Sequence, residues 1–339
     1  MTGRLFAVGL EGPRLSARER EILSAAPPWG VILFRRNLES LAELESLAGE
    51  LRELGIAHLL LDQEGGPVDR LKDLVAPAPA LRRLAGSGAA RRAGLATGAM
   101  LARLGFDVDL APVVDRAVPG AGSLVLGDRC AGEDPTEIVR VAGAFLEGLR
   151  ARGVGGCLKH FPGLGRATLD THAALPIVPR DPIEEVRDLE PFRRLMDHAG
   201  AVMVSHAAGP DGAPASLSPE VATRWLRGGL RFEGAAFSDD LEMGALSGFG
   251  GLPERCVRAS AAGCDLLLVC RRIEEYPACV DAVERGVAAN RRNEAAARLE
   301  GYAAAVASLR AAAGPPPETL AEVRAEFAAL GDEAGRSTA

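Results

Sequence analysis

The sequence lacks several features that would place the protein at a membrane or on a nucleic acid. No apolar run approaches the roughly 20 residues that a helix needs to cross a bilayer. Basic residues are not in excess, because 39 Lys and Arg stand against 46 Asp and Glu, for a net charge of −7. Nucleic-acid binding requires a basic face that neutralises phosphates. We therefore expect no nucleic-acid and no membrane partner.

The sequence also lacks the signs of an exported protein. Its first residues, Met1–Glu11, contain no long apolar segment and soon reach an acidic side chain, which argues against a signal peptide. The six cysteines include no C-x-x-C pair. Their even number is compatible with disulfides, but free core thiols are the better interpretation of a large chain without an export signal. We expect a cytoplasmic protein.

The 339 residues are 47% hydrophobic and 25% charged, as in a folded globular protein. Short apolar runs alternate with longer Ala-, Leu-, Glu- and Arg-rich segments, a pattern that predicts alternating strands and helices. The expected strands are Leu5–Val8, Gly30–Phe34, His58–Leu61, Val108–Leu110, Val154–Leu158, Ala201–Val204, Ala235–Phe237 and Cys264–Val269. The expected helices cover residues 16–25, 39–54, 86–105, 134–151, 183–199, 218–228, 253–262 and 276–289.

About eight strand-then-helix units predict an α/β fold of the (β/α)8 TIM-barrel type. The strands are continuously apolar, as expected of a parallel sheet covered on both faces. A doubly wound sheet shows the same alternation, but no G-x-G-x-x-G motif follows the first strand. We expect a single catalytic domain over residues 1–313. A partly helical C-terminal tail is expected over residues 314–339, after the Gly-Pro-Pro-Pro sequence that starts it.

Polar residues cluster just after the expected strands, where a barrel enzyme carries its chemistry. These segments are Asp62–Gly66, Ala111–Asp115, Gly127–Arg129, Lys159–Gly163 with Asp170–His172, His206, and Asp239-Asp240. Acids, bases and cations that meet at one mouth predict a site for a small polar ligand.

Each of these residues also has a purely structural interpretation. Asp240 is compatible with a helix N-cap, Glu64 with a glycine turn, and Lys159-His160 with a surface pair. His206 is equally compatible with a packed loop and with a pocket lining. The functional interpretation is favoured because several such residues follow different strands at the same end.

Four of these segments resemble glycoside hydrolase family 3, in its single-barrel bacterial branch of NagZ-like β-N-acetylglucosaminidases. They are Leu61–Gly66, Gly127–Arg129 with Gly132–Pro135, Lys159–Gly165 followed by Asp170–His172, and Phe237–Leu241. Their order and spacing fit the family from about Leu5 to Arg271.

The resemblance implies a retaining exo-β-N-acetylhexosaminidase that acts on muropeptide- or chitin-derived sugars through a covalent glycosyl-enzyme. Asp239 is then the nucleophile, and His172, paired with Asp170, is the acid/base. An imidazole with a pKa near ~6.5 can both donate and accept a proton near neutrality.

The sugar-binding residues carried over by the resemblance are Asp62, Arg129, Lys159 and His160, with Arg70 as a further candidate. The substrate is a small saccharide, and neither a metal nor an organic cofactor is implied. The chain departs from the family's usual sequence at Pro67, where the family commonly has arginine, and at Ala131 and Leu164. These departures bear on substrate preference and turnover. The expected assembly is a monomer or a weak homodimer.

Other functions are compatible with the same sequence. A phosphorylase would use phosphate as acceptor on this scaffold, and a catalytically weak sugar-binding homologue would bind without turnover. The β-glucosidase branch is disfavoured, because its acid/base generally comes from a second domain for which the chain has no room. A metal-dependent hydrolase built on His160, Asp170, His172 and His206 lacks the H-x-H or H-E-x-x-H spacing of a metal site.

Overall fold

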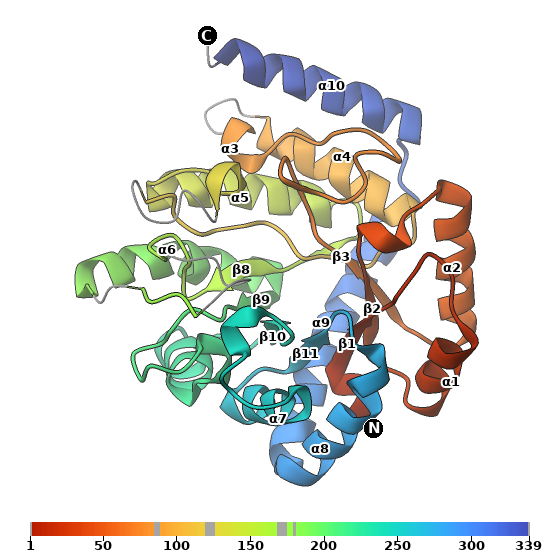
Figure 1. Ribbon diagram of the computed structural model, residues 1–339. Helices are drawn as coiled ribbons and strands as arrows, with labels where there is room; N and C mark the ends of the chain where they lie inside the picture. The colour runs from red at the N-terminus through yellow and green to blue at the C-terminus, as the bar shows by residue number, and fades with distance from the viewer. Residues whose placement is uncertain (1, 85–88, 119–125, 168–174, 179–180, 338–339) are drawn as a thin grey trace.

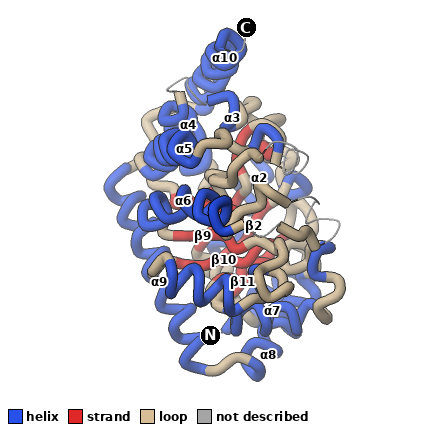
Figure 2. Tube along the Cα trace, turned by 90° about the vertical axis from the view of Figure 1, so that its left-hand side faces the viewer, coloured by secondary structure: helices blue, strands red, loops and turns tan. Residues whose placement is uncertain are grey.

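The computed structural model describes residues 2–84, 89–118, 126–167, 175–178 and 181–337. Parallel strands form a barrel at its centre, with helices on the outside (Figures 1 and 2). The strands of the main sheet are β1 (Phe6–Gly9), β2 (Gly30–Leu33), β3 (His58–Leu61), β6 (Val108–Asp109), β7 (Gly155–Gly156), β8 (Leu158–Phe161), β9 (Ala201–Val204), β10 (Ala235–Asp240) and β11 (Leu266–Val269).

The nine strands close into an eight-stranded barrel because two of them are consecutive pieces of one strand. The sheet runs in the order β7-β6-β3-β2-β1-β11-β10-β9-β8, and only Cys157 separates β7 from β8. β7 pairs with β6, and β8 pairs with β9. A parallel bridge between Val113 and Lys159 joins the two ends of the sheet. The predicted (β/α)8 barrel is confirmed.

The helices follow the strands in the order that a barrel requires. They are α1 (Ala17–Ala25), α2 (Leu41–Glu53), α3 (Leu81–Leu84), α4 (Ala90–Arg103), α5 (Pro135–Arg150), α6 (Pro182–Ala199), η6 (Glu220–Gly229), α7 (Leu252–Ala262), α8 (Tyr276–Gly286), α9 (Ala289–Ala313) and α10 (Leu320–Ser337). Local sequence sets where they start, since Asp134 and Asp181 each cap a helix whose first residue is proline.

The core explains why the strands read as continuous apolar runs. All residues of β1, β2, β9 and β11 are buried, between the barrel interior and the surrounding helices. All six cysteines are buried free thiols, as expected from the sequence. Within the described residues, no helix combines the length and apolar character needed to span a membrane.

The last helix, α10, lies on the outside of the barrel against α4 (Figure 1). It buries Val323, Phe327 and Leu330. Arg92 of α4 pairs with Glu326 and Glu333 of α10. The helical tail is therefore packed against the barrel on the side opposite α7 and α8.

One small element at the carboxyl end of the barrel shapes the site. After β3 the chain forms a hairpin from β4 (Gln63–Gly65) and β5 (Val68–Asp69). Gly65 has a φ of 83°, and a Cβ there would come within 2.3 Å of the Pro79 carbonyl oxygen. Only glycine fits at position 65 without strain, so Gly65 allows the hairpin to pack closely against Pro79.

Candidate active site

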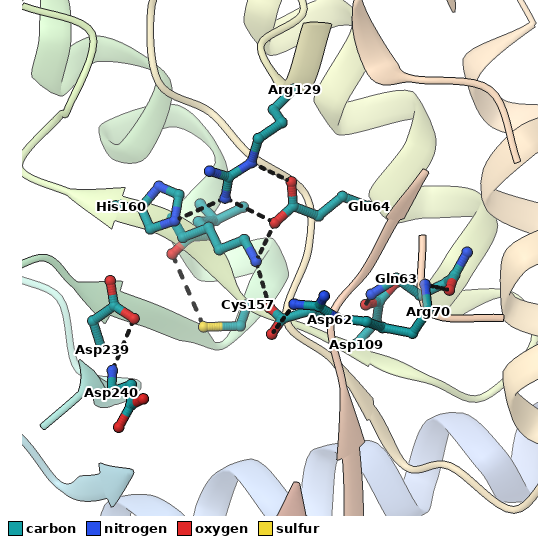
Figure 3. Close-up of polar contacts among 12 residues, drawn as sticks. Asp62, Gln63, Glu64, Arg70, Asp109, Arg129, Cys157, His160, Asp239 and Asp240 are labelled. Carbon is teal, nitrogen blue, oxygen red and sulfur yellow. Dashed lines mark hydrogen bonds and ion pairs between the residues drawn. The ribbon is translucent and has the colours of Figure 1, made fainter. Parts of the chain in front are cut away.

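A cavity of about 690 Å³ opens at the carboxyl ends of the strands. Five residues that the sequence analysis assigned to the sugar site, and the expected nucleophile, line it: Asp62, Arg70, Arg129, Lys159, His160 and Asp239. They follow or end different strands, so the barrel topology brings together residues up to 177 positions apart. Figure 3 shows their arrangement.

Lys159 is the central cation of the cavity wall. It belongs to β8, and its side chain is only 2% exposed. Its Nζ lies 2.6 Å from Asp62 Oδ1 and 2.5 Å from Glu64 Oε1. Burial works to lower the pKa of Lys159, but these two carboxylates outweigh it and raise that pKa. Lys159 is therefore a fixed positive charge.

Glu64 joins this lysine to a second cation. Arg129 Nε lies 2.7 Å from Glu64 Oε2, and Arg129 Nη2 lies 3.0 Å from Glu64 Oε1, which makes a bidentate pair. Burial works to raise the pKa of Glu64, but the charges of Lys159 and Arg129 lower it to about 2. Glu64 therefore stays ionised and holds both cations in place.

The hydrogen-bond partners of His160 determine its tautomer. Nδ1 lies 2.7 Å from Asp115 Oδ2, and Nε2 lies 3.2 Å from Arg129 Nη2. A guanidinium group can only donate, so Nε2 is the acceptor and the ring hydrogen is on Nδ1. Asp115 also accepts the backbone N–H groups of His160 and Leu164. This buried carboxylate fixes both the ring and the loop that follows it.

Asp239 lies in β10, across from Glu64 and Arg129 in Figure 3. Its Oδ1 accepts the backbone N–H of Asp240 at 2.8 Å. Burial works to raise the pKa of Asp239, but His206, His160 and that backbone hydrogen bond outweigh it and lower the pKa. The Asp239 carboxylate is therefore ionised at neutral pH while lining the cavity.

Asp240 differs from Asp239 although the two are adjacent. Its Oδ1 accepts the Glu242 N–H in a turn, and α7 begins only at Leu252, so it does not cap a helix. Burial, together with the negative charges of Glu242 and Asp239, raises the pKa of Asp240 to about 6. The two neighbouring carboxyl groups thus have pKa values shifted in opposite directions.

His206, for which the sequence left two interpretations open, is a packed residue. Its Nε2 donates to the Asp240 carbonyl oxygen at 2.8 Å, and its Nδ1 lies 2.7 Å from Ser216 Oγ. Burial lowers its pKa. The ring supports the backbone of β10 at the point where Asp239 and Asp240 enter the cavity.

Arg70 is the least tightly held of the predicted sugar-binding residues. Its Nη2 lies 3.8 Å from Asp62 Oδ2, and its guanidinium carbon lies 5.9 Å from the Phe34 ring centroid. Its buried Nε has no hydrogen-bond partner among the described residues. Of the departures from the family's sequence, Leu164 lines the cavity, whereas Pro67 is exposed at the turn of the hairpin.

Two predicted catalytic residues, Asp170 and His172, lie outside the described residues. Two other residues, Glu64 and Asp115, were not assigned to the sugar site from sequence. Glu64 comes shortly after β3 and Asp115 shortly after β6, and that position at the carboxyl end of the barrel was the available signal. The described residues contain no group of three or more His, Cys, Asp or Glu side chains placed to hold a metal ion.

Comparison with known proteins gives a consistent result. Residues 3–300 match the Glycosyl hydrolase family 3 N terminal domain. A beta-hexosaminidase of Thioalkalivibrio sulfidiphilus is 37% identical over 293 residues, which cover 81% of this chain and 83% of that protein. A beta-hexosaminidase of Pseudomonas aeruginosa is 37% identical over 294 residues, covering 84% of this chain and 87% of that protein.

Solved structures agree with these relatives. NagZ from Neisseria gonorrhoeae, in complex with N-trifluoroacetyl-D-glucosamine, superimposes with a TM-score of 0.81 at 30% identity, covering 97% of each chain. A family 3 beta-N-acetylglucosaminidase from Paenibacillus sp. gives a TM-score of 0.87 at 30% identity, covering 98% of this chain and 68% of that one. The chain belongs to glycoside hydrolase family 3 and is a glycoside hydrolase with the family's (β/α)8 barrel.

Proposed function

We propose that the protein is an exo-β-N-acetylhexosaminidase that hydrolyses terminal β-linked N-acetylglucosamine from muropeptide- or chitin-derived saccharides. The observation that carries the proposal is the position of Asp239, an ionised carboxylate that faces a cavity wall of paired cations and carboxylates. The relatives named beta-hexosaminidase and beta-N-acetylglucosaminidase support this choice of sugar.

In the proposed reaction Asp239 is the nucleophile. One carboxylate oxygen attacks the anomeric carbon as the glycosidic bond breaks, which gives a covalent glycosyl-enzyme. Water then attacks the same carbon and releases Asp239, so that two inversions retain the configuration. A pKa below the ordinary value suits this role, because the carboxylate is then ready to attack at neutral pH.

The proposed proton carrier is His172, oriented by Asp170. The imidazolium donates a proton to the glycosidic oxygen in the first step, and the neutral ring takes one from water in the second. Asp170 stabilises the imidazolium form, as in other carboxylate–histidine pairs. The support for this assignment is the Asp-x-His spacing in the segment after β8.

The proposed binding set for the reacting sugar consists of Asp62, Arg70, Arg129, Lys159 and His160. Lys159 can donate to a sugar hydroxyl because Asp62 and Glu64 occupy only part of its three-donor ammonium group. Asp62 accepts from a hydroxyl. Because Glu64 keeps both cations fixed, little reorganisation is needed when the sugar binds.

A pair of aryl substrates tests the proposed activity. The wild-type protein should release the phenol from an aryl N-acetyl-β-glucosaminide with a much higher kcat/KM than from an aryl β-glucoside. A preference for the glucoside would contradict the proposed sugar specificity. Tight binding of N-acetylglucosamine with no release of phenol would instead favour a sugar-binding protein without turnover.

The role of His172 has its own test. His172→Ala should lower kcat more for an N-acetyl-β-glucosaminide with a poor alkyl leaving group than for one with a nitrophenol, because only the poor leaving group needs a proton. The acidic limb of the pH–rate profile should also change. An equal loss for both leaving groups would contradict the assignment of His172 as general acid.

A further inference from the structure

The C-terminal helix α10 contacts a segment that leads back to the cavity. Arg324, an exposed residue of α10, donates from Nε to the Val75 carbonyl oxygen at 2.9 Å and from Nη2 to the Leu74 carbonyl oxygen at 3.2 Å. Both acceptors belong to residues 70–80, which connect β5 to α3 and which we name the β5–α3 loop. α10 also lies beside α3 and α4 (Figure 1). One arginine thus links the tail to this loop.

The part of the β5–α3 loop that Arg324 contacts is a closed turn. The N–H groups of Leu74 and Val75 both donate to the Leu71 carbonyl oxygen, at 3.0 and 2.8 Å. Leu71 and Val75 are both buried. Because the turn is closed by its own hydrogen bonds and packs two buried side chains, it can shift only as a unit. Its first residue directly follows Arg70 in the sequence.

The β4–β5 hairpin holds the start of the same loop. Gln63 of β4 is buried, and its Oε1 accepts the N–H groups of Arg70 and Leu71 at 3.0 and 3.2 Å (Figure 3). Its Nε2 donates to Asp69 Oδ1 at 2.7 Å. The other oxygen of Asp69 accepts the Ala78 N–H at 2.7 Å. The Arg70 backbone therefore lies between two supports, the hairpin on one side and the turn held by α10 on the other.

Arg70 depends on these supports because its own side chain makes few contacts. Its Nη2 lies 3.8 Å from Asp62, its guanidinium carbon lies 5.9 Å from the Phe34 ring centroid, and its buried Nε has no partner among the described residues. Arg129, in contrast, is held by a bidentate pair with Glu64. A binding side chain with so few contacts takes its position from the backbone that carries it.

We propose that Arg324 is a positioning residue for the sugar site: it holds the Leu71–Val75 turn from outside the barrel and thereby fixes Arg70 at the cavity. This inference rests on the proposed function, which assigns Arg70 to the reacting sugar. Arg324 does not line the cavity, so it acts through the β5–α3 loop. The C-terminal tail then supports the sugar site, in addition to covering α4.

The test compares two arginines that bind the tail to the barrel in the same way. Arg103 of α4 donates from Nε to the Glu318 carbonyl oxygen at 2.9 Å and from Nη2 to the Pro316 carbonyl oxygen at 3.1 Å. Like Arg324, it is exposed and makes two hydrogen bonds to backbone carbonyl oxygens. Its acceptors lie in the segment that leads into α10, not in the β5–α3 loop. Arg103→Met is therefore the matched control for Arg324→Met.

Arg324→Met should raise KM for an aryl N-acetyl-β-glucosaminide about threefold, the effect of one weak hydrogen bond. Its kcat should stay close to the wild-type value, because a sugar contact made equally in the ground and transition states affects KM alone. Arg103→Met should leave both quantities unchanged. Arg324→Lys, whose ammonium group can still donate to a carbonyl oxygen, should give an intermediate KM.

A double-mutant cycle separates positioning from a general loss of stability. Arg70→Met should itself raise KM. In that background Arg324→Met should raise KM no further, because the side chain that Arg324 positions is gone. Urea-unfolding midpoints are measured for the same variants, and Arg324→Met and Arg103→Met should be lowered by similar small amounts. If Arg324→Met does not fold, Arg324→Lys takes its place in the cycle.

The outcomes distinguish this inference from the proposed function. Equal KM values for Arg324→Met and Arg103→Met, or a KM effect of Arg324→Met that persists in Arg70→Met, would overturn the positioning role while wild-type turnover upholds the proposed function. If the wild type does not cleave the aryl substrate, the proposed function is overturned. The same cycle, measured as the Kd for N-acetylglucosamine, then decides the positioning role, and absence of both turnover and binding would overturn both proposals.

Discussion

The two ends of the barrel use the same charged side chains for different purposes. At the amino ends of the strands, Asp265 precedes β11 and accepts from Arg227, Arg291 and Arg298 and from the Ala236 N–H. Its side chain has no exposed surface. Neither Asp265 nor any of these arginines lines the cavity at the other end.

Asp107, just before β6, repeats the arrangement. It accepts from Arg52, from Arg310 of α9 and from the Leu59 N–H. Two of the arginines on Asp265, Arg291 and Arg298, also belong to α9. These ion pairs hold α9 against the amino ends of the strands. Both carboxylate oxygens of Asp265 and of Asp107 have a partner.

At the carboxyl ends the charges are paired around an open space instead. Lys159, Glu64 and Arg129 line the cavity as a connected group, and Asp239 faces them with a single hydrogen bond from a described residue, the Asp240 N–H. Chemistry in (β/α)8 barrels occurs at this end. The comparison indicates that the buried ion pairs at the amino ends stabilise the barrel, whereas the ion pairs that line the cavity form a site for a ligand. Four predictions test this difference between the two ends.

The largest expected effect is on turnover. Asp239→Asn should lower kcat for an aryl N-acetyl-β-glucosaminide by on the order of a thousandfold or more, because it removes the attacking oxygen. Its urea-unfolding midpoint should stay close to that of the wild type, since Asp239 stabilises little else. Steady-state kinetics and unfolding curves measure the two quantities. Wild-type turnover in this variant would contradict the catalytic role given to Asp239 at the carboxyl ends of the strands.

The next effect is on stability at the opposite end. Asp265→Ala should lower the free energy of unfolding by about 3–5 kcal/mol, because it leaves three arginines without their buried carboxylate. The protein that remains folded should keep its kcat. Urea unfolding and active-site-normalised kinetics check this, with Asp281→Asn, at an exposed position on α8, as the control. A stable but inactive variant would show that the two ends are not independent.

A smaller, pH-dependent effect is expected for Glu64. Its folded-state pKa of about 2 lies below the unfolded value of 4.5, so its contribution to stability is present above pH 4.5 and is lost as the pH falls toward 2. Glu64→Gln should have a lower free energy of unfolding than the wild type at pH 6, and this difference should become smaller by pH 3. Unfolding curves at several pH values measure the difference in free energy of unfolding. A difference that does not change with pH would contradict the ion-pair role of Glu64.

The smallest effect concerns a departure from the family's sequence. Pro67 is exposed at the hairpin turn, and the cavity is lined by Val68 and Arg70 instead. Pro67→Arg, which introduces the family's usual residue, should therefore leave kcat/KM close to the wild-type value, because position 67 does not line the cavity. A large change would show that the hairpin turn contacts the substrate.

Much of this architecture can be predicted from the sequence, because continuous apolar strands and the barrel's polar end are local patterns. Strand boundaries were less predictable. β10 was expected to end at Phe237 but continues to Asp240, since its pairing with Leu268 of β11 overrides the polar sequence. Likewise Lys159 and His160 lie within β8, which continues to Phe161, three residues beyond the expected strand end at Leu158.

The charge network was not predictable in the same way. Glu64 and Arg129 are 65 residues apart, and Asp115 and His160 are 45 apart. No local periodicity links such pairs, because only the closed barrel brings them together. The tautomer of His160 depends on its contacts with Asp115 and with Arg129, so it could be assigned only from the structure.

The central claim is that Asp239 forms a covalent bond to the sugar, and trapping this intermediate tests it most directly. The wild-type protein is incubated with an activated fluorosugar analogue of N-acetylglucosamine, digested and analysed by mass spectrometry. We predict one sugar adduct per chain, on the peptide that contains Asp239, and none in Asp239→Asn. An adduct on a peptide without Asp239, or turnover of the analogue with inversion at C1, would contradict the account.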